Sequence, residues 1–157
     1  MAKPIPDGYH SVSVSLTFKD SKKALEFYKR AFGAKVLGVF PSLDGKGTMH
    51  TTMQVGDSIV MMGDEMSGGG CKSAETLGAS PITLWIYTED VDSFFKKAVE
   101  AGAVQTMPVG DQFWGDRMGQ LKDPFGYSWG IATHKQDLSD EEVRKGAEKF
   151  FASMSKK

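Results

Sequence analysis

The chain has 157 residues, a formal net charge of −1 and a hydrophobic fraction of 40%, which is typical of a soluble globular protein of one domain or two small halves. No stretch approaches the roughly 18 apolar residues of a membrane span, and a charge near zero argues against binding to nucleic acid. The single Cys71 cannot form an internal disulfide. We therefore expect a reducing compartment, and a cytoplasmic location because the first ten residues lack the apolar segment of a signal peptide.

The first predicted elements are a strand and a helix. Polar and apolar residues alternate strictly over 11–18, a pattern typical of a strand with one buried face. Asp20 or Ser21 can cap the helix that follows, and its apolar residues recur at helical spacing until Gly33. Three strand-like segments come next, over residues 35–41, 47–55 and 58–64.

The same order of elements returns about 70 residues later, which indicates a tandem duplication. A strand is predicted over 82–88, and Asp90 caps a helix that ends at Gly102. Both helices close with Gly-Ala, at 33–34 and 102–103. Strands follow over about 104–109, 117–122 and 127–133, so each half is read as βαβββ.

Two further segments complete the predicted organisation. The stretch 66–80 contains three consecutive glycines and predicts a mobile linker. Ser139 and Glu142 form a capping box for a final helix, whose apolar stripe would comprise Val143, Ala147, Phe150 or Phe151, and Met154. The expected division is a first module over 8–65, a linker over 66–80, a second module over 81–134, and a C-terminal helix and tail over 135–157.

Several motifs, in this order, resemble the vicinal oxygen chelate superfamily, which includes glyoxalase I, bleomycin-resistance proteins and extradiol dioxygenases. They are Lys19-Asp20, Phe27-Tyr28, Ala31-Phe32-Gly33-Ala34, Glu89-Asp90-Val91-Asp92, Gly102-Ala103 and Asp123-Pro124-Phe125-Gly126. The run from Asp111 to Gly119 and the ending Ala132-Thr133-His134 are similar to a bacterial glyoxalase-like branch. The resemblance implies an α+β fold in which the two modules form a cupped, eight-stranded mixed sheet, with the helices on the convex face and the polar strand faces lining a pocket.

The resemblance also locates where a metal would bind. Metal-dependent members use His or Glu on the first strand and Glu on the last strand of each module. Here those positions carry Ser13, Thr83, Gly130, and Val60 or Met62. A stable divalent site needs carboxylate, imidazole or thiolate ligands, so we expect no metal at this centre and no cofactor.

His50 is the one candidate catalytic residue. It alternates with Thr52 and Gln54 on the polar face of its strand, so it is expected to point into the cup. It could act as a hydrogen-bond donor or general base, or it could be a plain part of the pocket wall. The resembled branch often pairs this His with a Glu two residues on, and here that position is Thr52. His10 and His134 are expected to be structural or exposed.

The aromatic run 113–117 leaves two alternatives open. Trp114 could stack on a planar ligand while Arg117 binds an anion. Alternatively, Trp114 plugs the sheet edge and Arg117 pairs with Asp116 or Asp111 to fix the loop. The expected ligand-binding set is Ser13, Ser15, Thr17, Thr52, Gln54, Met62, Thr83, Trp85, Tyr87, Trp114 and Arg117.

Three functions are compatible with this pattern. The favoured one is a metal-free protein that binds a small molecule in the cup, similar to the bleomycin-resistance group. The second is a lyase, isomerase or dioxygenase-like enzyme with non-standard metal ligands, and the third is a fold kept for an interaction. We also expect a homodimer, because members of this size commonly pair so that modules of both chains shape the cups.

Overall fold

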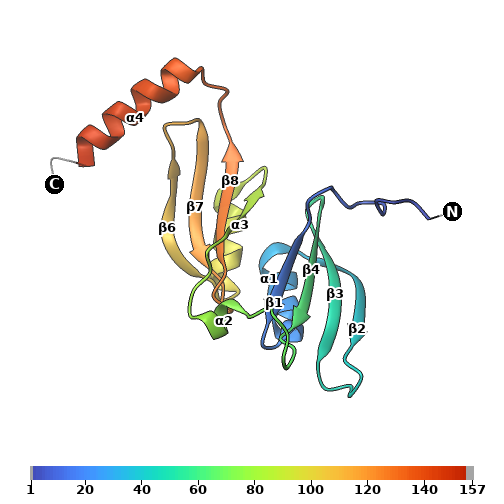
Figure 1. Ribbon diagram of the computed structural model, residues 1–157. Coiled ribbons are helices and arrows are strands. Elements are labelled where there is room, and N and C mark those ends of the chain that lie inside the picture. Colours follow the sequence, from blue (N-terminus) through green and yellow to red (C-terminus); the bar gives the residue numbers. More distant parts are fainter. Residues whose placement is uncertain (1, 155–157) are drawn as a thin grey trace.

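The computed structural model describes residues 2–154 (Figure 1). The last three residues of the predicted C-terminal segment, Ser155, Lys156 and Lys157, lie outside the described part. The two predicted βαβββ modules are confirmed, and a helix follows the second module. None of the helices within 2–154 is long and apolar enough to cross a membrane.

Module 1 is a four-stranded sheet with one long helix. Its elements are β1 (Val14–Phe18), α1 (Ser21–Phe32), β2 (Lys35–Pro41), β3 (Thr48–Val55) and β4 (Ser58–Asp64). The strand order is β1-β4-β3-β2, with β1 parallel to β4 and the other neighbours antiparallel.

Module 2 repeats this topology. Its elements are β5 (Thr83–Tyr87), α3 (Val91–Glu100), β6 (Val104–Asp111), β7 (Asp116–Lys122) and β8 (Ser128–His134). The order β5-β8-β7-β6 again has one parallel pair, β5 with β8. The strands therefore form two four-stranded sheets, and not the single eight-stranded sheet that was expected, since β1 and β5 each lie at the edge of their own sheet.

The predicted caps define the long helix of each module, α1 and α3. The Asp20 carboxylate accepts the Lys23 amide at 3.1 Å, and the Asp90 carboxylate accepts the Ser93 amide at the same distance. Each bond satisfies an orphan donor of the first turn. Gly33 ends α1 with a φ of 66°, a left-handed conformation that glycine adopts without steric cost.

The stretch predicted to be a linker contains one further element. A short helix, α2 (Ala74–Leu77), begins after Ser73, whose hydroxyl accepts the Thr76 amide at 3.1 Å. The Ser73 side chain is fully buried and donates to Glu65 at 2.5 Å. This contact attaches the linker to the end of β4.

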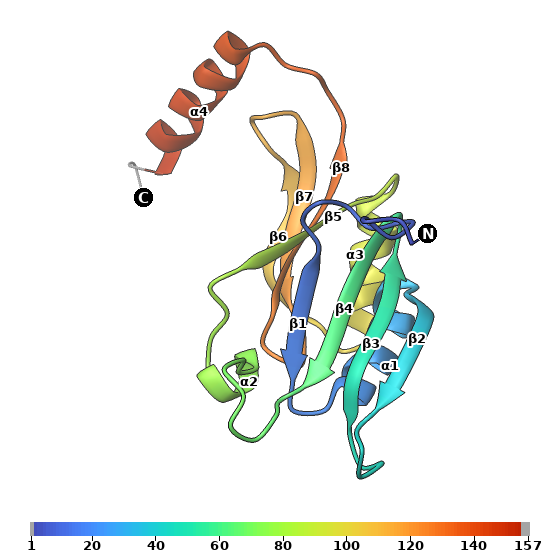
Figure 2. The same ribbon diagram turned by 45° about the vertical axis from the view of Figure 1, so that its right-hand side comes forward.

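The two modules share one hydrophobic core. Helices α1 and α3 pack against each other, and each covers one face of its own sheet (Figures 1 and 2). Phe32 of α1 lies 4.7 Å from the Trp129 ring and stacks on Phe94 of α3 at 5.8 Å. Aromatic contacts of this kind contribute beyond the apolar area they bury. The opposite face of each sheet is left without a helix, and we call it the open face.

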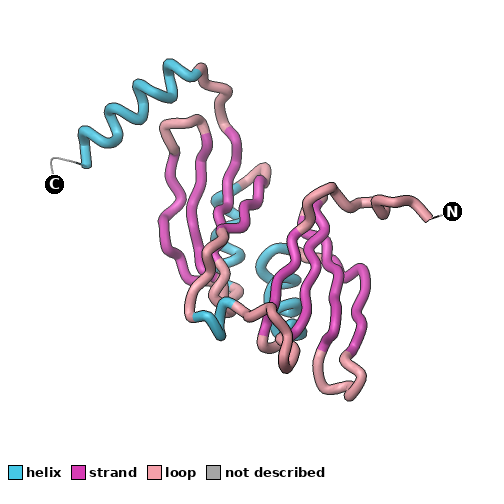
Figure 3. The backbone as a smooth tube through the Cα atoms, in the orientation of Figure 1, coloured by secondary structure: helices cyan, strands magenta, loops and turns pink. Residues whose placement is uncertain are grey.

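The final helix, α4 (Asp140–Met154), projects from the rest of the molecule (Figure 3). Its predicted capping box is present, with the Ser139 amide donating to Glu142 at 2.8 Å. The helix has no buried residue. It touches the β6–β7 loop through Phe113, whose ring lies 5.7 Å from that of Phe150.

Candidate functional site

The open face of module 1 carries most of the residues predicted from alternation. His50, Thr52 and Gln54 are partly exposed on β3, whereas the residues between them, Thr51 and Met53, are buried beneath the helix. On β1, Ser15 and Thr17 alternate with the buried Leu16 and Phe18 in the same way. A strand's period of two therefore places these side chains on the open face, as expected.

Met62 is an exception, because its side chain lies in the hydrophobic core and is 1% exposed. The strand register explains the error. Ser15 pairs with Met61, and in module 2 Trp85 pairs with Gly130. Met61, and neither Val60 nor Met62, is therefore the module 1 counterpart of Gly130. A shift of one residue moves every side chain of a strand to the other face.

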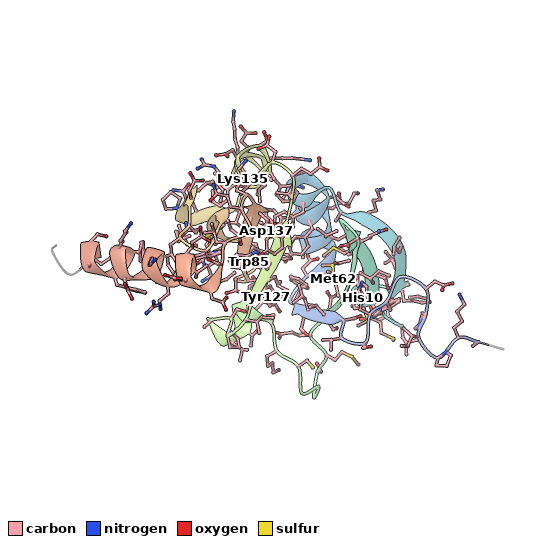
Figure 4. The ribbon with its side chains drawn as sticks, turned by 90° about the horizontal axis from the view of Figure 1, so that it is seen from above. His10, Met62, Trp85, Tyr127, Lys135 and Asp137 are labelled. Atoms are coloured by element: carbon pink, nitrogen blue, oxygen red, sulfur yellow. The ribbon has the colours of Figure 1, made fainter. Side chains whose placement is uncertain are left out.

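A groove of 730 Å³ runs between the edge strands β1 and β5 and joins the two modules. It brings together four of the predicted residues, Ser13, Thr83, Trp85 and Tyr87. His10, which sequence reasoning set aside, also lines it from the segment before β1 (Figure 4). His50, Thr52 and Gln54 are not among its lining residues. We call this space the β1–β5 groove.

Trp85 covers the backbone of Gly130 on the open face of module 2. A Cβ atom placed on Gly130 would lie 2.4 Å from Cε3 of the Trp85 ring, far inside van der Waals contact. Gly130 is itself buried, while Trp85 is 42% exposed. A glycine inside a strand marks such a close approach, so the sequence did carry this signal. The indole thus occupies the position that a longer side chain at residue 130 would take.

The residues at the superfamily's metal centre do not fit a divalent ion. With the corrected register the four positions carry Ser13, Thr83, Gly130 and Met61, and none of these offers a carboxylate, imidazole or thiolate. Within residues 2–154 there is also no group of three or more His, Cys, Asp or Glu side chains arranged to hold a metal.

Asp116, which sequence reasoning named only as a partner for Arg117, is a buried hydrogen-bond centre at the far end of the open face. Its carboxylate accepts the Tyr87 hydroxyl at 3.1 Å and the Trp114 indole N–H at 3.1 Å. His134 Nδ1 lies 2.7 Å from the other oxygen, and Nε2 lies 3.0 Å from Asp137. The carboxylate of Asp116 and then that of Asp137 raise the pKa of His134 by stabilising the imidazolium.

Tyr87 connects this cluster to the β1–β5 groove. Partial burial and then the hydrogen bond to Asp116 raise the pKa of its phenol, so the group stays neutral and donates. Its ring lies 6.4 Å from that of Trp85 and is 62% exposed. Two neighbouring aromatic rings are therefore presented on the open face, with the hydroxyl of one held in place by a buried carboxylate.

Arg117 points to the helix side of its sheet. Nε and Nη2 donate to the two carboxylate oxygens of Asp92 at 2.7 and 2.8 Å, and Nη1 donates to Asp111 at 3.2 Å. Of the two alternatives for Arg117, these contacts support the one in which it pairs with acidic side chains and fixes the loop, with Asp92 on α3 as the main partner. A guanidinium engaged by two carboxylates fixes the loop and offers little to a ligand.

His50 lies on the open face, and none of the acidic residues within 2–154 forms a hydrogen bond or ion pair with it. Its Nε2 is 3.1 Å from the Thr52 hydroxyl, and its ring lies 6.4 Å from that of Phe40. A general base is usually oriented by a carboxylate or another acceptor. At His50 that orienting group is a hydroxyl two residues away on the same strand.

Comparison with known protein families identifies the family of this chain. The chain belongs to the Glyoxalase/Bleomycin resistance protein/Dioxygenase superfamily, whose family model matches residues 10–131. It is 34% identical over 137 residues to the uncharacterized protein Rv0887c of Mycobacterium tuberculosis, covering 85% of this chain and 80% of the relative. It is 32% identical over 124 residues to the uncharacterized protein At5g48480 of Arabidopsis thaliana, covering 75% and 74%.

Solved structures show the same architecture. TioX from Micromonospora sp. ML1 superposes with a TM-score of 0.65 at 26% identity, covering 80% of this chain and 99% of that one. The Arabidopsis At5g48480 gene product superposes with a TM-score of 0.61 at 28% identity, covering 79% and 98%.

Proposed function

We propose that this protein binds a small aromatic molecule in the β1–β5 groove, without a divalent metal at the superfamily centre. The observation that carries the proposal is the Trp85 indole, which lies over Gly130 where metal-dependent relatives are expected to place a carboxylate. An exposed indole beside the Tyr87 ring offers a stacking surface at the place where the fold would otherwise bind a metal.

The size and lining of the groove support this proposal. Its 730 Å³ falls within the range of small-molecule sites, roughly 300–1,000 Å³. Two aromatic rings supply apolar contact, while the hydroxyls of Ser13 and Thr83 and the imidazole of His10 supply a few polar groups. The alternative, a superfamily enzyme that uses His50, is less well supported, because within residues 2–154 that imidazole is hydrogen-bonded to the Thr52 hydroxyl and to no carboxylate.

Indole N–H signals in ¹⁵N NMR spectra provide the test, because the chain has three tryptophans in different surroundings. Trp85 faces the groove, and Trp114 lies outside its lining and donates to Asp116. Trp129 also touches the groove, but it is 2% exposed and donates its indole N–H to the buried Asp123. Single substitutions to Phe assign the three signals. The protein is then titrated with 2-naphthol and with 2-naphthoate, which share an aromatic body and differ in charge.

The proposal predicts that the Trp85 signal moves most and that the Trp129 signal, whose N–H is held by Asp123, moves less. The Trp85→Ala variant should lose the binding, whereas Trp114→Phe should keep it. If neither naphthalene compound moves the Trp85 signal, or if Trp85→Ala binds as tightly as the parent chain, the aromatic site is wrong. Elemental analysis that finds a stoichiometric metal lost in His50→Ala would favour the enzyme instead.

We also propose that the protein is a homodimer. Large apolar side chains remain exposed on the open faces and on α4, among them Phe40 at 64%, Tyr87 at 62% and Met154 at 59%. Twofold pairing is the commonest way to cover such surfaces. Light scattering that gives a monomer mass at micromolar concentration would contradict this.

A further inference from the structure

A second and larger groove lies at one end of module 1 and shares no lining residue with the β1–β5 groove. It has a volume of 1110 Å³ and is bounded by α1 with the two residues before it, the β2–β3 hairpin loop, the end of β4 with the residues after it, the β7–β8 turn, and Ala101 after α3. Figures 1 and 2 show the hairpin loop and the segment after β4 at the same end of the molecule. We call it the α1 groove.

The carboxylates of the α1 groove are already engaged by the protein. Asp64 accepts two backbone amides, those of Ser21 and Thr48, each at 2.7 Å. Glu65 accepts the Ser73 amide at 2.6 Å and the Ser73 hydroxyl, which lowers its pKa to about 2. The other three acids are likewise held, with Asp20 capping α1, Glu26 paired to Lys29, and Asp44 bonded to Ser42.

The bases of the same groove are mostly free. Lys23 pairs with Asp20 at 3.1 Å. The remaining four side chains have no hydrogen bond or ion pair to any of residues 2–154, and all four are exposed: Lys19, Lys22, Arg30 and Lys46. The acidic and basic residues that line the groove are equal in number, so their formal charges cancel. The acids are already hydrogen-bonded within the protein, however, so the charged groups still free to bind a ligand are hydrogen-bond donors. That capacity suits an anion.

Apolar side chains line the space between these bases. Leu43 at the hairpin tip is 99% exposed, Met66 is 61% exposed and Met49 is 48% exposed. Phe27 and Phe125, whose ring centroids lie 6.0 Å apart, also contribute to the lining. Exposed flexible side chains around a concave surface are typical of a site that accepts an apolar body.

Asp64 holds the groove open in a fixed shape. The hydrogen bonds that it accepts from two backbone amides join the start of α1 to the start of β3, so the helix and the hairpin cannot separate without breaking them. A Cβ atom on Gly47 would lie 2.7 Å from the Asp64 carboxylate, which shows how closely the hairpin approaches. A site with preset walls loses less entropy on binding.

We propose that the α1 groove binds an amphipathic organic anion, a carboxylate or phosphate monoester attached to a hydrocarbon body. The apolar body would lie against Leu43, Met49 and Met66, and the anionic head would accept hydrogen bonds from Lys22 and Lys46 on opposite walls. The combination of saturated carboxylates, free bases and exposed apolar side chains favours this ligand class over a neutral or cationic one.

The test is isothermal titration calorimetry of the full chain with four probes. Octanoate and octyl phosphate carry both features, octyl glucoside lacks the charge, and inorganic phosphate lacks the apolar body. The first two should bind measurably more tightly than the last two. Lys22→Gln/Lys46→Gln should weaken octanoate binding by about fivefold or more, given the strength of charge-assisted contacts at exposed sites. The matched control, Lys97→Gln/Lys149→Gln, makes the same charge change outside the groove and should have no effect.

Three results would overturn the proposal. They are equal binding of octyl glucoside and octanoate, an unchanged affinity in Lys22→Gln/Lys46→Gln, or recruitment to phosphatidylglycerol vesicles without binding of free octanoate. The last would mean a surface for membrane lipid. Leu43→Ser, at a fully exposed position, should weaken octanoate without lowering the melting temperature. Trp85→Ala should leave octanoate binding intact, which separates this site from the one in the β1–β5 groove.

Discussion

The contact between Trp85 and Gly130 can be measured by a double-mutant cycle. In the parent chain, Gly130→Ala places a methyl group 2.4 Å from the indole, so the ring must move. Gly130 is not among the glycines with positive φ, so its backbone conformation suits alanine, and the space above it decides the outcome. Removing the ring with Trp85→Ala should make the same substitution harmless.

The expected magnitudes follow from two opposing effects. Alanine in place of a strand glycine stabilises by about 0.5–1 kcal/mol, because it restricts the unfolded chain. Overpacking costs roughly 1–3 kcal/mol. We expect the lower end of that cost here, since Trp85 is 42% exposed and can swing outward. Gly130→Ala should therefore destabilise the parent by about 0.5–1 kcal/mol and stabilise Trp85→Ala by about the same, a coupling of about 1–2 kcal/mol.

Urea unfolding followed by far-ultraviolet circular dichroism is the assay, because Trp85 itself contributes to fluorescence. Gly38→Ala is the matched control, since a Cβ atom there meets nothing within 4 Å and its φ is not positive. It should stabilise both backgrounds equally. If Gly130→Ala changes the free energy of unfolding by the same amount with and without Trp85, the indole does not cover residue 130. The stacking site proposed for the β1–β5 groove would then lose its basis.

Three further predictions concern buried and charged groups. Asp123 accepts hydrogen bonds from the Tyr28 hydroxyl, the Trp129 indole and two backbone amides. In urea titrations, Asp123→Ala should therefore lower the free energy of unfolding by about 3–5 kcal/mol, because it removes all four bonds. Tyr28→Phe removes one bond and should lower it by about 1–2 kcal/mol. Equal costs for the two variants would mean that the Tyr28 bond alone accounts for the effect, and would refute the stabilising role of the other three hydrogen bonds to Asp123. The pKa of Glu65 is lowered from 4.5 to about 2, so the stabilisation from its carboxylate is complete above pH 4.5 and is lost as the pH falls toward 2. Between these pH values, the melting temperature of Glu65→Gln should depend less on pH than that of the parent chain. The pKa of His134 is raised above 6.5, so the stabilisation from its imidazolium is complete below pH 6.5 and is lost as the pH rises through the pKa of the folded protein. An NMR titration that places this pKa at or below 6.5 would contradict the prediction.

Local patterns in the sequence were sufficient for the elements and their caps. Alternation placed the first strand of each module, strand-like segments between turn residues placed the other strands, and helical spacing placed the helix of each module. Asp20, Asp90 and Ser139 cap the helices as predicted. Each of these features depends on residues a few positions apart, and the physical rule that governs it acts over the same short distance. The same holds for the polar faces of β1 and β3.

What depends on pairing between distant residues was decided by the tertiary structure alone. The register of β4 beside β1 put Met61, and not Met62, on the open face. The packing of α1 on α3 and the separation of β1 from β5 divided the strands into two sheets with a groove between them. Arg117 found its main partner on α3, and Asp116 collected donors from three segments. Periodicity fixes the face of the sheet on which a side chain lies along its own strand. It carries no information about which residue is the neighbour on the next strand, or about which side chains from different strands come together at a binding site.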